Sequence, residues 1–333
     1  MGSVTLDLDT LQRRALDLVK QADFGPESIR VNTQIVELLP NDQGAWTRLG
    51  RCYLEQRQFD EAVTALRTAL AISPTMTIAT NLLAEVRKRR ALNPTATQRA
   101  ATGFSSREFA LIETLTGGDL LQALRPRMEA LFDVINATSI AAKIVSARHR
   151  NGATGPKLYQ LNSYYAGDAG HVFAFHYGGR WEPQFNLGWF APPIMASCLR
   201  IGIGFNLSAA GRDPERGAGL ERVLRYFERF QQIIASSWQR ELARWMAADG
   251  GFIQYGPNPP ELAMLPDRAL ERIVSCQSPI AVEWIFIGRW LFLDKSDDAK
   301  ILGDRARLAT VIDATFRTLY PLWHATYAES TPA

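Results

Sequence analysis

Residues 199–208 have the sequence LRIGIGFNLS, in which two kinds of side chain alternate. The odd-numbered positions carry leucine, isoleucine or phenylalanine, and the even-numbered positions carry Arg200, Gly202, Gly204, Asn206 and Ser208. Successive side chains of a β-strand point to opposite faces of the sheet, so the stretch predicts a strand with one apolar face and one nearly bare face. Because glycine has no side chain, something else must fill the space above that bare face.

The preceding segment, 183–190, alternates in the same way. In PQFNLGWF, Gln184, Asn186 and Gly188 fall on one side of the predicted strand, opposite aromatic and aliphatic residues. If the two strands are neighbours, amide groups, one arginine and three glycines share a face of the sheet. A helix of the chain itself would fill the space above the glycines. A flat ligand would also fill it, bound by the amide and arginine side chains and stacked on Trp181.

Further short segments rich in aromatic or β-branched residues surround this pair and predict strands at 157–167, 171–179, 250–256 and 282–293. Apolar residues at helical spacing predict helices at 105–115, 119–148, 219–247 and 297–327. This order predicts an α+β domain over residues 106–333, with a mostly antiparallel sheet and helices packed on one side.

A different pattern occupies residues 43–74, QGAWTRLGRCYLEQRQFDEAVTALRTALAISP. Two predicted helices carry small residues where they cross and large residues around the crossing: Trp46, Leu49, Gly50 and Tyr53 in the first, and Ala62, Leu66, Ala69 and Pro74 in the second. The stretch resembles a tetratricopeptide repeat (TPR). That resemblance implies a pair of antiparallel helices and a protein-interaction surface on the first helix of each pair. Thr47, Arg48 and Arg51 are the candidate exposed positions there.

A second, less regular copy precedes this repeat by 34 residues, because Pro40 and Glu27 correspond to Pro74 and Glu61. With a capping helix at 75–90, an all-α, TPR-like domain is predicted over residues 1–90, followed by a linker at 91–105. The predicted partner of this domain is another protein or a second copy of the chain. Packing against the second domain is the alternative role.

The chain of 333 residues is long enough for two domains. Its hydrophobic content of 47% is typical of a globular protein. The net charge of +3 gives no overall basic field, although arginine supplies 31 of the 37 basic residues, the other six being lysine. The three cysteines are far apart, which is typical of reduced thiols. With no signal-peptide pattern at the N-terminus and no uninterrupted apolar span, the predicted location is the cytoplasm, without membrane contact.

The sequence offers little metal or cofactor chemistry. Four histidines occur without a recognised metal-binding spacing, so no metal site and no cofactor are predicted. One alternative is a nuclease that uses Mg²⁺, because Asp168, Glu182 and Gln184 loosely resemble the Asp…Glu-x-Lys order of restriction-type nucleases. Glutamine stands in the place of the lysine, and Pro183 lies within the motif; both depart from the pattern.

Arginines gather beside the predicted strand pair, at Arg212 in a loop and at Arg222, Arg225 and Arg229 along one face of the predicted helix. Together with the glycine-rich sheet face, they favour a non-catalytic protein that recognises nucleic acid or a nucleotide, with the TPR-like unit making protein contacts. Such a layout would suit a bacterial DNA-processing or phage-defence system. A metal-dependent nuclease and a pure protein-interaction scaffold are the alternatives.

Overall fold

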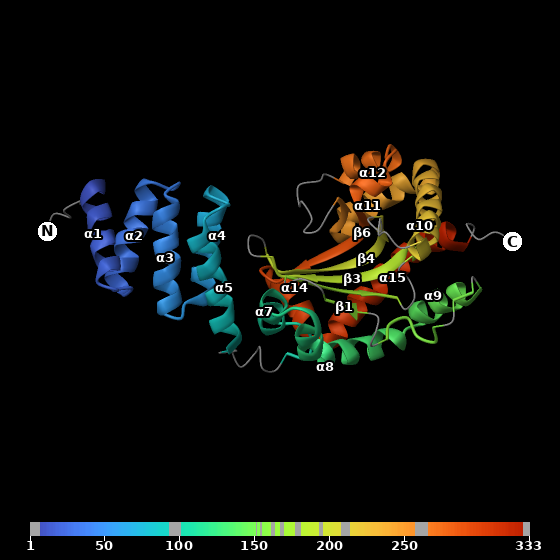
Figure 1. The fold of residues 1–333 in the computed structure, drawn as a ribbon, viewed down its shortest axis with the longest axis horizontal. Helices are drawn as coiled ribbons and strands as arrows, with labels where there is room; N and C mark the ends of the chain where they lie inside the picture. Colours follow the sequence, from blue (N-terminus) through green and yellow to red (C-terminus); the bar gives the residue numbers. More distant parts are fainter. Residues whose placement is uncertain are drawn as a thin grey trace. The chain divides into compact units, whose positions relative to one another are not determined.

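The structure, a computed structural model, describes residues 7–92, 101–150, 152–153, 155–160, 164–166, 170–176, 181–192, 196–207, 214–256 and 266–328. These residues form two compact units. Helices α1–α5 make up the first unit, and helices α7–α15 with a six-stranded sheet make up the second (Figure 1).

The first unit consists of α1 (Leu8–Lys20), α2 (Pro26–Leu38), α3 (Gln43–Glu55), α4 (Phe59–Ile72) and α5 (Thr77–Leu92). Residues buried in α2 recur 34 positions later in α4, in five pairs: Ser28 and Ala62, Val31 and Ala65, Asn32 and Leu66, Ile35 and Ala69, and Val36 and Leu70. This shared burial confirms that α2 and α4 are the second helices of successive repeats. Gly50 of α3 lies against α4, where an added Cβ would be 2.6 Å from Leu66 Cδ2.

The helices of the second unit are α7 (Ser106–Thr114), α8 (Gly117–Asn136), α9 (Ser139–Arg150), α10 (Pro214–Ile233), α11 (Gln239–Asp249), α12 (Pro266–Val274), α13 (Pro279–Val282), α14 (Ser296–Gly303) and α15 (Arg305–Ala328). A π-helical turn, Ile234–Trp238, joins α10 to α11. The strands are β1 (Tyr164–Tyr165), β2 (His171–Phe175), β3 (Gln184–Phe190), β4 (Cys198–Asn206), β5 (Gly251–Tyr255) and β6 (Trp284–Phe292).

The strands form one sheet in the order β1-β2-β3-β4-β6-β5, and each neighbouring pair is antiparallel. The α+β prediction with a mostly antiparallel sheet is therefore confirmed. Because β6 lies between β4 and β5, the two strands formed late in the chain complete a sheet that began with β1–β4.

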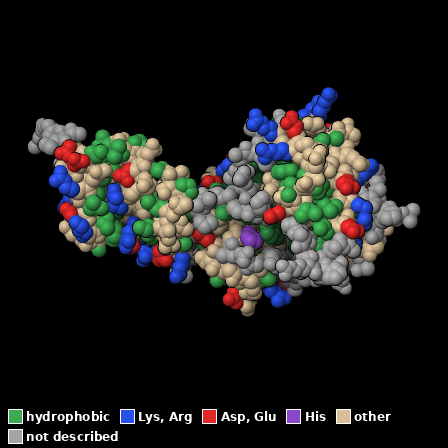
Figure 2. All heavy atoms as spheres, turned by 45° about the horizontal axis from the view of Figure 1, so that its top comes forward, with side chains coloured by type: hydrophobic (Ala, Val, Ile, Leu, Met, Phe, Trp, Pro, Cys, Tyr) green, Lys and Arg blue, Asp and Glu red, His purple; other side chains and the backbone are tan. Residues whose placement is uncertain are grey.

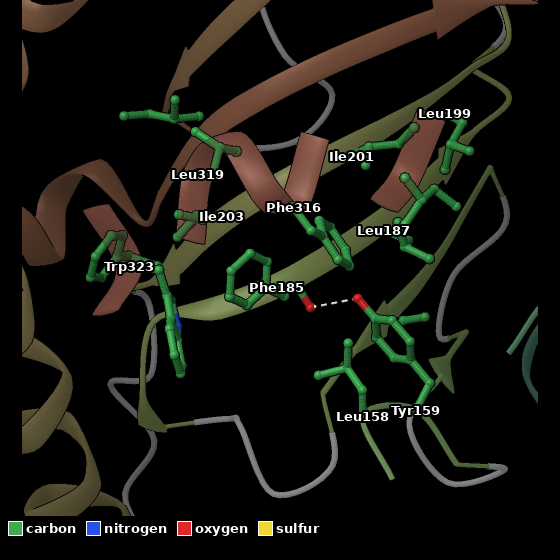
Figure 3. Close-up of a cluster of buried hydrophobic side chains, with 14 of the residues drawn as sticks. Leu158, Tyr159, Phe185, Leu187, Leu199, Ile201, Ile203, Phe316, Leu319 and Trp323 are labelled. Atoms are coloured by element: carbon green, nitrogen blue, oxygen red, sulfur yellow. Dashed lines mark hydrogen bonds between the residues drawn. The ribbon is translucent and has the colours of Figure 1, made fainter. Parts of the chain in front are cut away.

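The main core lies on the apolar face of the sheet, as expected from the alternation in β3 and β4 (Figure 3). The ring of Phe185 from β3 lies 4.8 Å from that of Phe316 and 5.2 Å from that of Trp323, both in α15. Phe205 of β4 similarly lies 4.7 Å from Phe230 of α10. These contacts attach α10 and α15 to one face of the sheet.

Several sequence-based expectations differ from the structure. The single helix predicted at 297–327 is two helices, α14 and α15, separated at Asp304, whose carboxylate accepts the backbone N–H groups of Ala306 (2.9 Å) and Arg307 (3.1 Å) at the start of α15. Of the described residues in the strand predicted at 157–167, those at 157–160 are not in a strand and Tyr164–Tyr165 form β1; the backbone N–H and carbonyl of Tyr159 bond to the side chain of Asn136 instead. The single helix predicted at 119–148 is two helices, α8 and α9, which meet at an angle of 81°. The break falls at Thr138, whose hydroxyl accepts a hydrogen bond from the backbone N–H of Ala141 in α9 (3.3 Å).

Within the described ranges, no single helix combines the length and the hydrophobicity needed to cross a membrane, and only the bent α8–α9 pair has them when its two helices are taken together.

Candidate functional sites

The two strands that carry the glycine-rich face are neighbours, as the sequence analysis supposed. Gln184 pairs with Gly204, Asn186 with Gly202, and Gly188 with Arg200. The amide groups, the arginine and the glycines therefore share one face of the sheet, opposite the main core.

Side chains of the same chain fill the space above Gly188 and Gly204. A Cβ added at Gly204 would lie 2.8 Å from the indole ring of Trp284, which comes from β6. A Cβ added at Gly188 would lie 2.8 Å from Nε of Arg200 and 2.9 Å from the ring of Phe190. Gly188 and Gly204 thus make room for large internal side chains, whereas Gly202 lies against the backbone of β6 at Ile287 and Gly288.

Arg200 occupies the centre of this face and is fully buried. Its guanidinium carbon lies 4.6–5.0 Å from the centroids of four aromatic rings, those of Phe173, Phe190, Trp284 and Phe286. The guanidinium also donates a hydrogen bond to Oε1 of Gln254 in β5. Burial lowers the pKa of Arg200, whereas the four π faces and the amide oxygen favour its cationic form. Arg200 therefore acts as an internal cation that links β4 to four other strands of the sheet.

The other residues predicted to bind a ligand from the sheet are also mostly internal. Gln184 and Asn186 are buried, and Nδ2 of Asn186 donates to Oε1 of Gln184 (3.2 Å). Gly202 faces Gly288 of β6, and Asn206 is half-buried at the end of β4. These side chains are brought together as expected, but they face the interior of the unit.

The residues predicted to bind from outside the sheet have different environments. The half-buried indole of Trp181 packs against Gly219 of α10, where an added Cβ would lie 2.6 Å from Cε2 of the ring. Arg222 and Arg225 are exposed on α10, and Arg229 is half-buried. Arg212 lies outside the described residues. Among these predicted contacts, Arg222 and Arg225 are the ones that the structure leaves exposed to solvent.

Glu182 belongs to a buried polar cluster, defined here as the Glu182 cluster: Arg148, His176, Glu182 and Tyr327. Its Oε1 lies 2.6 Å from Nη2 of Arg148 and 3.0 Å from Nε2 of His176. Nδ1 of His176 accepts the backbone N–H of Phe185 at 3.4 Å, so Nε2 carries the hydrogen that faces Glu182. Tyr327 of α15 also hydrogen-bonds the carboxylate. The cluster thereby ties α9 and α15 to the start of β3.

The environment of Glu182 keeps it ionised. Burial by itself raises the pKa of this carboxyl, but the hydrogen bond from His176, the charge that His176 takes up in acid, the charge of Arg148 and the hydroxyl of Tyr327 outweigh burial and lower the pKa to about 2. Burial, followed by the charge of Arg148, lowers the pKa of His176, against the opposing effect of Glu182. The cluster therefore holds a carboxylate, a guanidinium and a neutral imidazole together.

The nuclease alternative required Asp168, Glu182 and Gln184 to hold a metal ion together. Asp168 lies outside the described residues. The carboxylate of Glu182 contacts Arg148, and the amide of Gln184 is bonded to Asn186. In the part of the chain that the structure describes, no three or more His, Cys, Asp or Glu side chains are arranged to hold a metal ion.

In the first unit, positive charge is concentrated on the first helices of the repeats. Helices α1, α3 and α5 carry seven basic residues whose side chains are described, Arg13, Arg14, Lys20, Arg48, Arg51, Lys88 and Arg89, and four acidic ones, Asp9, Asp17, Glu55 and Glu85. Helices α2 and α4 carry two basic residues, Arg30 and Arg67, and four acidic ones, Glu27, Glu37, Asp60 and Glu61. Figure 2 shows Lys and Arg side chains along the lower edge of this unit.

Arg48, Arg51 and Glu55 form one strip of α3, because they are spaced three and four residues apart. Glu55 pairs with Arg89 of α5 at 3.1 Å, which continues the strip onto the next first helix. Arg51 is exposed, with its guanidinium 4.6 Å above the ring of Phe24. Arg48 is half-buried and donates to Asn32. This surface, together with Arg13 on α1 and Lys88 on α5, is called the first-helix strip below.

The expectation that Thr47 is exposed was wrong. Its side chain is buried, and its hydroxyl donates to the carbonyl of Gln43 at 2.7 Å. A threonine hydroxyl in a helix commonly bonds the carbonyl four residues earlier, which satisfies the group without solvent.

The tetratricopeptide repeat family model matches residues 43–76. The first unit thus contains a TPR-like repeat, and a repeat of this kind indicates a protein–protein contact. Comparison with curated proteins and with solved structures found no match to the chain.

Proposed function

We propose that the protein is a docking protein whose first unit binds a carboxylate-rich segment of a partner on the first-helix strip. The observation that carries this proposal is the concentration of basic residues on α1, α3 and α5 relative to α2 and α4. Arg13, Arg51 and Lys88 make no ion pair with any residue that the structure describes, so their charges are available to a partner. Opposite charge across an interface favours encounter and fixes specificity.

Peptide selection tests this proposal. Random peptides displayed against the full chain should become enriched in Asp and Glu, and a selected peptide should bind in fluorescence anisotropy. Arg51→Glu should weaken that binding about fivefold, which corresponds to roughly 1 kcal/mol for one reversed charge at a partly exposed site. Arg30→Glu is the matched control, because Arg30 is an exposed arginine on the second helix α2.

Two results would contradict the proposal: selected peptides without carboxylates, or equal losses from Arg51→Glu and Arg30→Glu. Equal losses would mean that only the net charge of the unit matters. Sedimentation of the wild-type chain over a range of concentrations distinguishes a separate partner from a second copy, since self-association through the strip depends on concentration and is reduced by Arg51→Glu.

Nucleic acid is the second candidate ligand, and the observation that favours it is the pair of exposed arginines on α10. Arg222 and Arg225 lie one helical turn apart and form no ion pair with another described residue. The sheet face no longer contributes, because Gln184, Asn186 and Arg200 are buried. Two exposed cations alone make a weak phosphate-binding surface.

Filter binding at graded salt tests this second candidate. Arg222→Ala combined with Arg225→Ala should reduce the affinity for single-stranded DNA, duplex DNA or RNA, and should lower the salt slope by about 1.5–2. Arg30→Ala combined with Arg67→Ala, in the first unit, should leave the slope unchanged. If the wild-type chain binds no nucleic acid at low salt, or if the α10 variant keeps the wild-type slope, nucleic-acid recognition by α10 is wrong.

A further inference from the structure

A hollow of about 550 Å³ lies between α9 and the segment that follows it. Residues 155–160, called the returning segment below, lie beside α9. Hydrogen bonds fix both ends of this returning segment. Nε2 of His149 donates to the carbonyl of Gly155 (2.8 Å), and the side chain of Asn136 bonds both the N–H (3.0 Å) and the carbonyl (2.8 Å) of Tyr159. The walls of the hollow are therefore held by described contacts.

One face of α9 forms the floor of the hollow. Ala142, Val145, Ser146 and His149 line it at the spacing of adjacent helical turns. The side chains of Ala142 and Ser146 are small and do not fill the hollow, and Val145 provides an apolar surface. Pro156, which is exposed, adds a second apolar side chain from the returning segment, whereas the side chain of Leu158 is buried in the main core. The floor thus offers apolar contacts beside polar ones such as the Ser146 hydroxyl, as a site for a ligand with both kinds of group requires.

The rim of the hollow is positively charged. Arg150 and Lys157 line it and are exposed, and neither forms an ion pair with a residue in the described ranges. The described lining includes no aspartate or glutamate. Arg148, two residues before Arg150, differs because it points inward to Glu182. Two cations without local carboxylates, placed beside a concave apolar surface, favour an anion that also carries an apolar group.

We propose that this hollow binds a small organic anion, with its acid group between Arg150 and Lys157 and its apolar part over Val145 and Pro156. The guanidinium of Arg150 supplies planar paired donors for a carboxylate or phosphate, and Lys157 supplies a second charge. This inference does not rest on the docking role of the first unit, since all the residues involved belong to the second unit.

Equilibrium dialysis of the full chain with radiolabelled octanoate tests the proposal. Octanoate should bind at one saturable site, because it combines a carboxylate with an apolar chain of suitable size. Arg150→Ala combined with Lys157→Ala should weaken binding at least about tenfold, as expected when charged hydrogen bonds are lost. Ser146→Leu should weaken it by a similar factor by filling the floor while keeping both cations. Octanamide and inorganic phosphate, which each lack one half of the recognised chemistry, should bind at least about tenfold more weakly.

Lys143→Ala is the matched control, because Lys143 is exposed on α9 but does not line the hollow. Its affinity for octanoate should stay within about twofold of the wild type. Circular dichroism of each variant identifies any loss of folding. The proposal is overturned if octanoate shows no saturable binding up to about 10 mM, where an interaction is negligible. It is also overturned if folded Arg150→Ala/Lys157→Ala or folded Ser146→Leu binds as the wild type does.

Discussion

Replacing Glu182 by glutamine is expected to lower the unfolding free energy of the second unit by about 3–5 kcal/mol at neutral pH. The substitution keeps the size of the side chain but removes its charge, so the guanidinium of Arg148 remains inside the protein without its carboxylate. Arg148 is only 2% exposed and therefore has little access to water. Leaving one partner of a buried ion pair uncompensated is among the most destabilising single changes.

The double variant Arg148→Met/Glu182→Gln separates the charge effect from general disruption. Methionine keeps most of the volume of the arginine stem and removes the charge, so the double variant should recover most of the loss caused by Glu182→Gln alone. The exposed pair Arg125–Glu129, with atoms 2.9 Å apart, provides the control. Glu129→Gln should cost less than about 1 kcal/mol. Urea unfolding monitored by near-ultraviolet circular dichroism measures all three variants.

The same variants should differ in their response to acid. Because the pKa of Glu182 is about 2 in the folded chain and near 4.5 when unfolded, its ionised form stabilises the fold above pH 4.5, and that contribution is lost as the pH falls toward 2. The lowered pKa of His176 acts in the same direction, since the unfolded imidazole takes up a proton below about pH 6.5 before the folded one does. Glu182→Gln should retain the histidine part and lose the carboxylate part. A loss below 1 kcal/mol at neutral pH, with an unchanged acid profile, would contradict this account of the cluster.

The pattern of residues within a segment was sufficient to predict those helices and strands that depend on that segment alone. The 34-residue spacing of Glu27 and Glu61 located the repeated helices, and the buried positions of α2 and α4 follow the same spacing. Alternation in β3 and β4 assigned each side chain to its face, and the pairing of Asn186 with Gly202 agrees with that assignment. Period and spacing are local properties, so one sequence reveals them.

The candidate sites depended on contacts that local pattern does not contain. Trp284 and Phe286 fill the space above Gly204 because β6 pairs with β4, yet about 80 residues separate these strands. Arg148 and Tyr327 reach Glu182 from α9 and α15. The hollow beside α9 exists because 155–160 returns along that helix instead of forming the predicted strand. The sequence around Glu182, which precedes a proline, did not predict the residues that contact this carboxylate. The arginines and aromatic residues that surround these sites were nevertheless prominent in the composition.

Gly202→Ala is expected to cost the second unit more than about 4 kcal/mol, or to prevent it from folding. An added Cβ would lie 2.6 Å from Cα of Gly288 and closer still to the carbonyl oxygen of Ile287. These are backbone atoms of β6, which is hydrogen-bonded to β4 on one side and β5 on the other. The strand therefore has no free direction in which to move, and relief requires breaking part of the sheet.

A graded series makes this prediction specific to the pairing of Gly202 with Gly288. Gly204→Ala should cost less, because the nearest atoms to its added Cβ belong to the ring of Trp284, a side chain that has some freedom to shift. Gly118→Ala, at the start of α8, should be neutral or stabilise by up to about 1 kcal/mol, since nothing lies within 4 Å of the new atom and alanine favours helix. Thermal and urea unfolding of the full chain should rank the losses as Gly118, Gly204, Gly202. If Gly202→Ala unfolds like the wild type, β4 and β6 do not approach each other as closely as described. In that case the explanation for glycine at a strand position where a bulky residue is expected is wrong as well.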